Sequence, residues 1–123
     1  MMNPNMVVLY VNDTVTSRVF YSDLFQRQPV ESSPNFSGFA LESGLFVGLW
    51  LRPKVMPAAQ ANAGAAELAF PVADAKAVDA VYENWRGRGL VIAQEPTDMD
   101  FGRTFVALDP DGHRLRVVAD PAR

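Results

Sequence analysis

The chain has 123 residues, of which 49% are hydrophobic and 20% charged, and its formal net charge is -3. A chain of this length buries about two thirds of its unfolded surface, which supports one domain without a disulfide or structural metal. The absence of cysteine excludes disulfides, thiolate nucleophiles and iron–sulfur clusters, and the single histidine, His113, excludes a multi-histidine metal site within one chain. A pI near 5.0 argues against nucleic acid as a partner. Because no basic leader or long apolar run is present, we expect a cytoplasmic protein with no membrane partner.

The first half of the chain predicts a strand, a helix and three more strands. Residues 6–11 form an apolar run, and Asp13 can cap a helix over residues 14–25, where apolar side chains recur at helical spacing. Turn-forming residues then separate three predicted strands, which cover residues 28–32, 36–41 and 45–51. The following segment, residues 53–65, is rich in Pro, Ala and Gly and predicts a linker with at most one short helical turn.

The second half repeats this order. A strand over residues 67–72 precedes a helix that is capped by Asp74 and ends at Gly87-Arg88-Gly89. Three further strands are predicted over residues 90–94, 101–108 and 113–118, the last two joined by the turn Asp109-Pro110-Asp111-Gly112. An offset of about 61 residues aligns four identical pairs: Val11 with Val72, Asp13 with Asp74, Tyr21 with Tyr82 and Val30 with Val91.

We therefore predict an α+β fold in a single domain, residues 1–123, made of two βαβββ modules at about residues 5–52 and 66–119. Each module is expected to form a small curved mixed sheet with one helix on its outer face, and pairing the modules leaves a concave side. The aromatic residues of the two helices, Phe20, Tyr21, Tyr82 and Trp85, are expected to pack against the outer faces of the sheets.

Several phrases of the sequence resemble the vicinal oxygen chelate superfamily, which includes glyoxalase I, extradiol dioxygenases and bleomycin-resistance proteins. The resemblance runs from Met6 to Val118 and rests on the combination of short motifs with the two-module order. The residues that carry it are Leu9-Tyr10-Val11, Asn12-Asp13, Phe20-Tyr21, Phe46, Leu49-Trp50, Glu67, Phe70 to Asp74, Phe101 to Phe105 and Asp109 to Val117. It implies a concave ligand pocket and a homodimer.

Metal-dependent members of the superfamily place ligands, typically His, Gln and Glu, on strands of both modules. The corresponding positions here are Met6, Glu67 and Arg116, and no Asp, Glu or His lies between Glu42 and Glu67. A thioether suits hard divalent ions poorly, and a guanidinium repels them. We therefore expect no metal and no cofactor, and an ion pair between Glu67 and Arg116 if both side chains face the concave side; otherwise both are partly solvated.

Metal-free members of the superfamily sequester aromatic antibiotics, and the resemblance to these members implies a site lined by aromatic side chains. Trp50 is the expected stacking wall at the pocket mouth, with the alternative of a half-buried core residue. Arg103 is expected to hold a ligand carboxylate, unless it is an edge-strand charge. His113 is interpreted as a turn neighbour, or else a proton donor or acceptor. The full set of expected ligand-binding residues is Trp50, Phe46, Phe39, Phe101, Arg103, Glu67, Arg116 and Met6.

The function expected from these residues is metal-free binding of a phenazine-, bleomycin- or mitomycin-like antibiotic that confers resistance, with no catalytic residue assigned. One alternative is a metal-dependent lyase or oxidoreductase of the glyoxalase or dioxygenase type, with Glu67 as base or a metal completed by a partner chain. Another is an accessory domain that binds a peptide.

Overall fold

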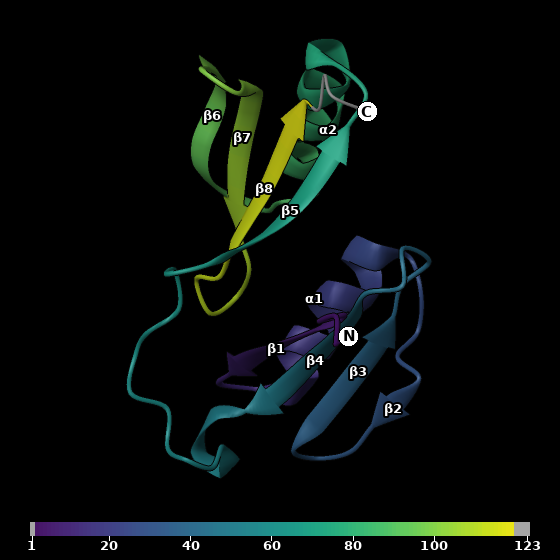
Figure 1. Cartoon of the computed structure of the whole chain (residues 1–123), viewed down its shortest axis with the longest axis vertical. Coiled ribbons are helices and arrows are strands. Elements are labelled where there is room, and N and C mark those ends of the chain that lie inside the picture. Colours follow the sequence, from purple (N-terminus) through teal and green to yellow (C-terminus); the bar gives the residue numbers. More distant parts are fainter. Residues whose placement is uncertain (1, 120–123) are drawn as a thin grey trace. The chain divides into compact units, whose positions relative to one another are not determined.

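The computed structural model describes residues 2–119, which divide into two compact units, one ending at Asn62 and the other beginning at Ala63. Each unit contains one four-stranded mixed sheet and one α-helix, as Figure 1 shows. The fold is α+β, and the order strand, helix and three strands occurs twice, as the sequence predicts.

The first unit has the strand order β1-β4-β3-β2. Strand β1 (Met6–Val11) runs parallel to β4 (Phe46–Leu51), because α1 (Thr14–Phe25) and the intervening strands form the crossover between them. Strands β3 (Phe36–Ala40) and β2 (Glu31–Ser32) continue the sheet in antiparallel pairing. A single 3-10 turn, η1 (Arg52–Lys54), follows β4.

The second unit has the strand order β5-β8-β7-β6. Strand β5 (Glu67–Val72) runs parallel to β8 (Arg114–Ala119), and α2 (Ala75–Gly87) follows β5. Strands β7 (Gly102–Leu108) and β6 (Val91–Met99) complete the sheet in antiparallel pairing.

Each helix begins at an aspartate that caps it and packs its aromatic residues against its own sheet. Asp13 accepts hydrogen bonds from the N–H groups of Val15 and Thr16, and Asp74 accepts one from Ala77. Tyr21 of α1 is fully buried, and Trp85 of α2 contacts the rings of Phe70 and Phe105 edge-on. The predicted packing of the helical aromatic residues on the sheets is confirmed for Trp85 and for Tyr82, whose ring meets that of Phe105 edge-on with centroids 5.4 Å apart. In residues 2–119, neither helix is long and apolar enough to cross a membrane.

Two predicted strands differ in length by more than one residue from those in the structure. The strand predicted over residues 28–32 is reduced to β2, and the strand predicted to end at Gln94 continues to Met99 as β6. Pro96 lies within β6 without breaking it, because β6 is an edge strand and its register shifts twice between Ile92 and Thr97.

Candidate functional site

One face of the sheet in the first unit carries a set of aromatic and apolar side chains that the helix does not cover. Alternate residues of a strand share a face, and the register aligns these residues in three rows across β1, β4 and β3. The rows are Tyr10–Trp50–Phe36, Val8–Gly48–Gly38 and Met6–Phe46–Ala40. We call this set the first open face.

The middle row of the first open face has two glycines side by side, and rings from both neighbouring rows lean over them. A Cβ atom built on Gly38 would lie 2.3 Å from Cζ of Phe46, and one built on Gly48 would lie 2.7 Å from Cζ of Phe36. Any larger residue at either glycine would therefore displace a ring. The two glycines let Phe36 and Phe46 lie low over the sheet, which leaves a shallow apolar floor.

The residues at the two ends of the first open face are partly exposed. Trp50 is half-buried and meets Tyr10 edge-on, with ring centroids 6.2 Å apart. Met6 has 48% of its surface exposed. Trp50, Phe46 and Met6, all expected in the site from sequence, therefore share one face.

Phe39, by contrast, lies on the opposite face of β3. It is fully buried and contacts Phe25 of α1 edge-on at 5.5 Å between ring centroids. Phe36 and Phe39 are three residues apart, so they point to opposite sides of the strand. Phe39 belongs to the core beneath α1, and we leave it out of the candidate site.

The face of the second sheet that lies opposite α2 carries a polar cluster around Arg116 of β8. The Nε of Arg116 donates to Oε1 of Glu67 at 2.7 Å, which confirms the ion pair expected from sequence. Its Nη1 donates to Oγ1 of Thr104 at 3.1 Å and to Oε1 of Gln94 at 3.4 Å. The Arg116 and Glu67 side chains are 18% and 34% exposed, so the pair is only partly shielded from solvent. We call Glu67, Gln94, Thr104 and Arg116 the Arg116 cluster.

Thr104 is well prepared to accept a hydrogen bond from Arg116. Its own hydroxyl proton is donated to the carbonyl oxygen of Val117 at 2.7 Å, so the oxygen lone pairs face the guanidinium. Phe101, in the turn between β6 and β7, lies against the same guanidinium at 6.0 Å from the ring centroid and is 53% exposed. Phe101 therefore lies against Arg116, another of the residues expected in the site from sequence.

Arg103 points to the other face of the same sheet. Its Nε donates to Asp79 of α2 at 2.7 Å and its Nη1 donates to Asp98 of β6 at 3.0 Å. The hydrogen bond to Asp79 and then that to Asp98 raise the pKa of Arg103 above its ordinary value. Because two carboxylates of the chain already bind this guanidinium, its observed contacts join the helix to the sheet, and we leave it out of the candidate site.

The residues at the superfamily's metal position do not fit a divalent ion in the second unit. The one carboxylate there, Glu67, is bound by Arg116, and the guanidinium brings a positive charge to the place where a cation would have to sit. Glu67 is therefore the partner of a cation of the chain, and these residues do not form a site for a divalent metal ion.

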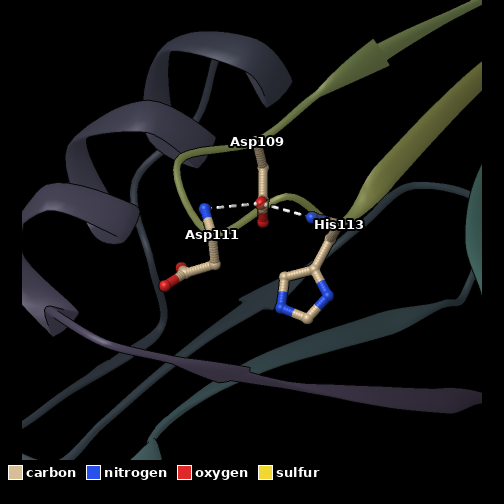
Figure 2. A group of neighbouring side chains, drawn as sticks. All are labelled: Asp109, Asp111 and His113. Atoms are coloured by element: carbon tan, nitrogen blue, oxygen red, sulfur yellow. Dashed lines mark hydrogen bonds between the residues drawn. The ribbon is translucent and has the colours of Figure 1, made fainter. Parts of the chain in front are cut away.

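The turn between β7 and β8 brings together Asp109, Asp111 and His113, three residue types that bind metals. Figure 2 shows that the Asp109 carboxylate binds the backbone of the turn. Its Oδ1 accepts a hydrogen bond from the N–H of Asp111 at 2.9 Å and another from the N–H of His113 at 2.8 Å. Asp109 is nearly buried, and Gly112 has a φ of +92°, which favours glycine. The geometry explains the three residues as a tight turn closed by an aspartate.

Four aromatic or hydrogen-bonding side chains of the first open face and the Arg116 cluster were not among the residues expected from sequence: Tyr10, Phe36, Gln94 and Thr104. Tyr10 and Phe36 alternate with core residues along their strands, so the period of two places them opposite the core once the helix side is known. Gln94 and Thr104 come together with Arg116 only through strand register, which no local pattern of the sequence reveals.

Comparison with known proteins gives a consistent result over nearly the whole chain. Residues 3–117 match the model of the Glyoxalase/Bleomycin resistance protein/Dioxygenase superfamily. The phenazine antibiotic resistance protein EhpR of Enterobacter agglomerans is 28% identical over 117 residues, which cover 93% of this chain and 89% of EhpR.

Solved structures extend the comparison. The solution structure of protein ATC0852 from Agrobacterium tumefaciens is 44% identical, with a TM-score of 0.90 over 99% of this chain and 100% of that one. A glyoxalase-related enzyme from Fulvimarina pelagi is 21% identical with a TM-score of 0.83, over 98% of this chain and 90% of that one, and it shares the fold.

Proposed function

Because the chain belongs to the Glyoxalase/Bleomycin resistance protein/Dioxygenase superfamily, we propose that it is a metal-free protein that binds and sequesters a small aromatic antibiotic. The ligand is of the phenazine type, with bleomycin- and mitomycin-like compounds as the other classes to be tested. Sequestration lowers the free concentration of the compound and so confers resistance.

The observation that carries the proposal is the first open face. Trp50, Tyr10, Phe36 and Phe46 present aromatic surface around the two glycines of β3 and β4, and α1 leaves that face uncovered. A planar aromatic ligand gains free energy from burial of its faces and from offset or edge-to-face contacts with such rings. A side chain in place of Gly38 or Gly48 would displace the ring of Phe46 or Phe36 that lies over it.

The relationship to EhpR supports a role in antibiotic resistance. The named function of that relative is phenazine antibiotic resistance, and the alignment covers most of both chains. The identity of 28% supports the general role, and the ligand itself is part of our proposal.

Catalysis of the metal-dependent type finds little support in the residues of the second unit. Glu67, the one carboxylate at the positions that the resemblance assigns to metal ligands, is bound by Arg116 at 2.7 Å, so its charge is already paired with a cation of the chain. The alternative function, a metal-dependent lyase or oxidoreductase, is therefore included as an outcome of the experiment below. The homodimer and the cytoplasmic location that the sequence analysis expects stay predictions, and sedimentation and cell fractionation test them.

Tryptophan fluorescence provides the direct test. The protein has two tryptophans, half-buried Trp50 on the first open face and Trp85 in the core beneath α2. Titration with phenazines, quinones and glycopeptide antibiotics, with EDTA and again with added divalent metal, should give saturable quenching that EDTA does not change. A Trp50→Phe variant, which keeps only Trp85, should lose most of the quenching.

Two results would overturn the proposal. Binding or turnover that appears only with added metal would identify an enzyme of the superfamily instead. Failure of every aromatic compound to quench Trp50 would remove the first open face as a ligand site.

A further inference from the structure

We propose that the Arg116 cluster recognises the carboxylate of an aromatic acid. The inference goes beyond the proposed function, because it rests on contacts within the second unit alone. It replaces Arg103, the arginine expected from sequence to hold a carboxylate, with an arginine on the opposite face of the same sheet.

The side chain of Arg116 is held in place by the protein itself. Glu67 binds its Nε, while Thr104 and Gln94 bind its Nη1. An arginine fixed by several acceptors loses little side-chain entropy on binding a further one. Arg116 is therefore preorganised, whereas a free surface arginine is not.

The guanidinium of Arg116 also keeps hydrogen-bond donors that the contacts of its Nε and Nη1 do not use. Within residues 2–119, Nη2 of Arg116 has no hydrogen-bond partner, and 18% of the side chain is exposed. A guanidinium with one unused nitrogen donates charge-assisted hydrogen bonds to a carboxylate oxygen, which are stronger than those to a neutral carbonyl. The open donor thus distinguishes an acid from its amide.

The charged strand residues on the same face as Arg116 carry a net positive charge. The strand residues with charged side chains on it are Arg116 and Arg114 of β8 and Glu67 of β5, where Arg114 and Glu67 are register partners. Two cations and one carboxylate leave one net positive charge. The other charged residues of β6 and β7 that the contacts place, Glu95, Asp98 and Arg103, bond on the α2 side of the sheet or to each other. The charge of these strand residues favours an anionic group at Arg116, although Asp100 in the adjacent turn adds one negative charge.

The guanidinium of Arg116 also has an aromatic neighbour, Phe101. Phe101 lies against the guanidinium of Arg116 and keeps 53% of its surface exposed. The ring of an aromatic acid can therefore contact Phe101 while its carboxylate reaches Nη2. The same arrangement would give a simple inorganic anion no apolar contact, so an aromatic acid is the class of ligand that uses all of these residues.

The test compares acids with amides of the same size. Two-dimensional ¹H–¹⁵N NMR follows the Nε–Hε resonance of Arg116 and the backbone of the second unit during titration with 2-naphthoate and with 2-naphthamide. We expect the acid to bind at least about tenfold more tightly than the amide, as a charge-assisted hydrogen bond provides. Phenazine-1-carboxylate and its carboxamide form a second pair, measured by fluorescence.

Three variants separate recognition from a structural role. Arg116→Gln should weaken binding of the acid about 10- to 100-fold and leave the amide unchanged. Glu67→Gln keeps an acceptor for Nε but removes a negative charge, so it should strengthen binding of the acid by about threefold or more. Arg103→Gln, on the opposite face, is the matched control and should not change the preference for the acid.

The outcomes are independent of those for the proposed function. Equal affinity for acid and amide, loss of affinity in Glu67→Gln, or no binding of either naphthyl probe would overturn this inference even if phenazines quench Trp50. A preference for the acid that depends on Arg116 would support it even if no compound quenches Trp50, in which case only the proposed aromatic site of the first unit fails.

Discussion

The guanidinium of Arg116 and the carboxylate of Glu67, 49 residues apart in the chain, meet at 2.7 Å across the parallel strands β8 and β5. The resemblance described in the sequence analysis implies metal ligands at both positions in metal-dependent members. In this chain the two side chains bind each other.

The Glu67–Arg116 pair should show measurable coupling. In a double-mutant cycle of Glu67→Ala and Arg116→Ala, we expect a coupling free energy of about 1 kcal/mol in the free energy of unfolding, because the pair is partly shielded and has good geometry. Chemical denaturation of the four proteins measures it, and the coupling should fall at high salt. Strictly additive effects of the two changes would contradict a stabilising pair.

Replacement of Trp50 should weaken the binding of aromatic ligands without unfolding the protein. Trp50→Ala is expected to cost about 1 to 3 kcal/mol in the free energy of binding, because it removes one stacking surface of the first open face. Isothermal titration calorimetry measures the change. The control is Trp50→Phe, which keeps an aromatic ring and should lose less affinity; an unchanged affinity in the alanine variant would remove Trp50 from the site.

The two glycines of the middle row offer a test of the flat floor. In Gly38→Ala the new methyl group must displace Phe46, and in Gly48→Ala it must displace Phe36. We expect each variant to fold and to bind a planar ligand about tenfold more weakly, a loss near 1.4 kcal/mol. Gly87→Ala is the control, since a Cβ there meets no atom within 4 Å. Wild-type affinity in both floor variants would show that ring position is unimportant.

Arg103 should stabilise the second unit over the whole neutral pH range. The hydrogen bonds that Arg103 donates to Asp79 and Asp98 raise its pKa, so the guanidinium stays charged. Its contribution to stability is present below its ordinary pKa and is lost only as the pH rises through the raised value. Arg103→Gln should therefore lower the melting temperature by a similar amount at pH 6 and pH 9. A destabilisation that disappears between these two pH values would contradict this origin.

Asp109 should act as a structural turn residue. Asp109→Ala leaves the N–H groups of Asp111 and His113 without their acceptor and is expected to cost about 1 to 3 kcal/mol in the free energy of unfolding. Asp109→Asn keeps an oxygen at the same position and should recover most of that loss. If Ca²⁺ or Mn²⁺ raised the melting temperature of the wild type but not of Asp109→Asn, the turn would be a metal site instead.

The sequence by itself determined the order of the elements and several of their ends. Asp13 and Asp74 cap the two helices as predicted, because a cap depends on one side chain and the two or three residues after it. The Glu67–Arg116 pair could also be predicted from the sequence, since the resemblance to the family implies that both side chains lie on one face of the sheet.

The tertiary structure decided which side of each strand faces the helix. Phe36, Phe39 and Arg103 lie in strands that are apolar or buried on both sides, so the alternation of polar and apolar residues is too weak to assign a face. Phe39 joins the core and Arg103 joins α2 because packing of each helix on its sheet selects one set of alternate residues, and the opposite set becomes the open face. Strand β6 likewise extends past Pro96 because only the assembled sheet makes it an edge, where a missing N–H donor costs little.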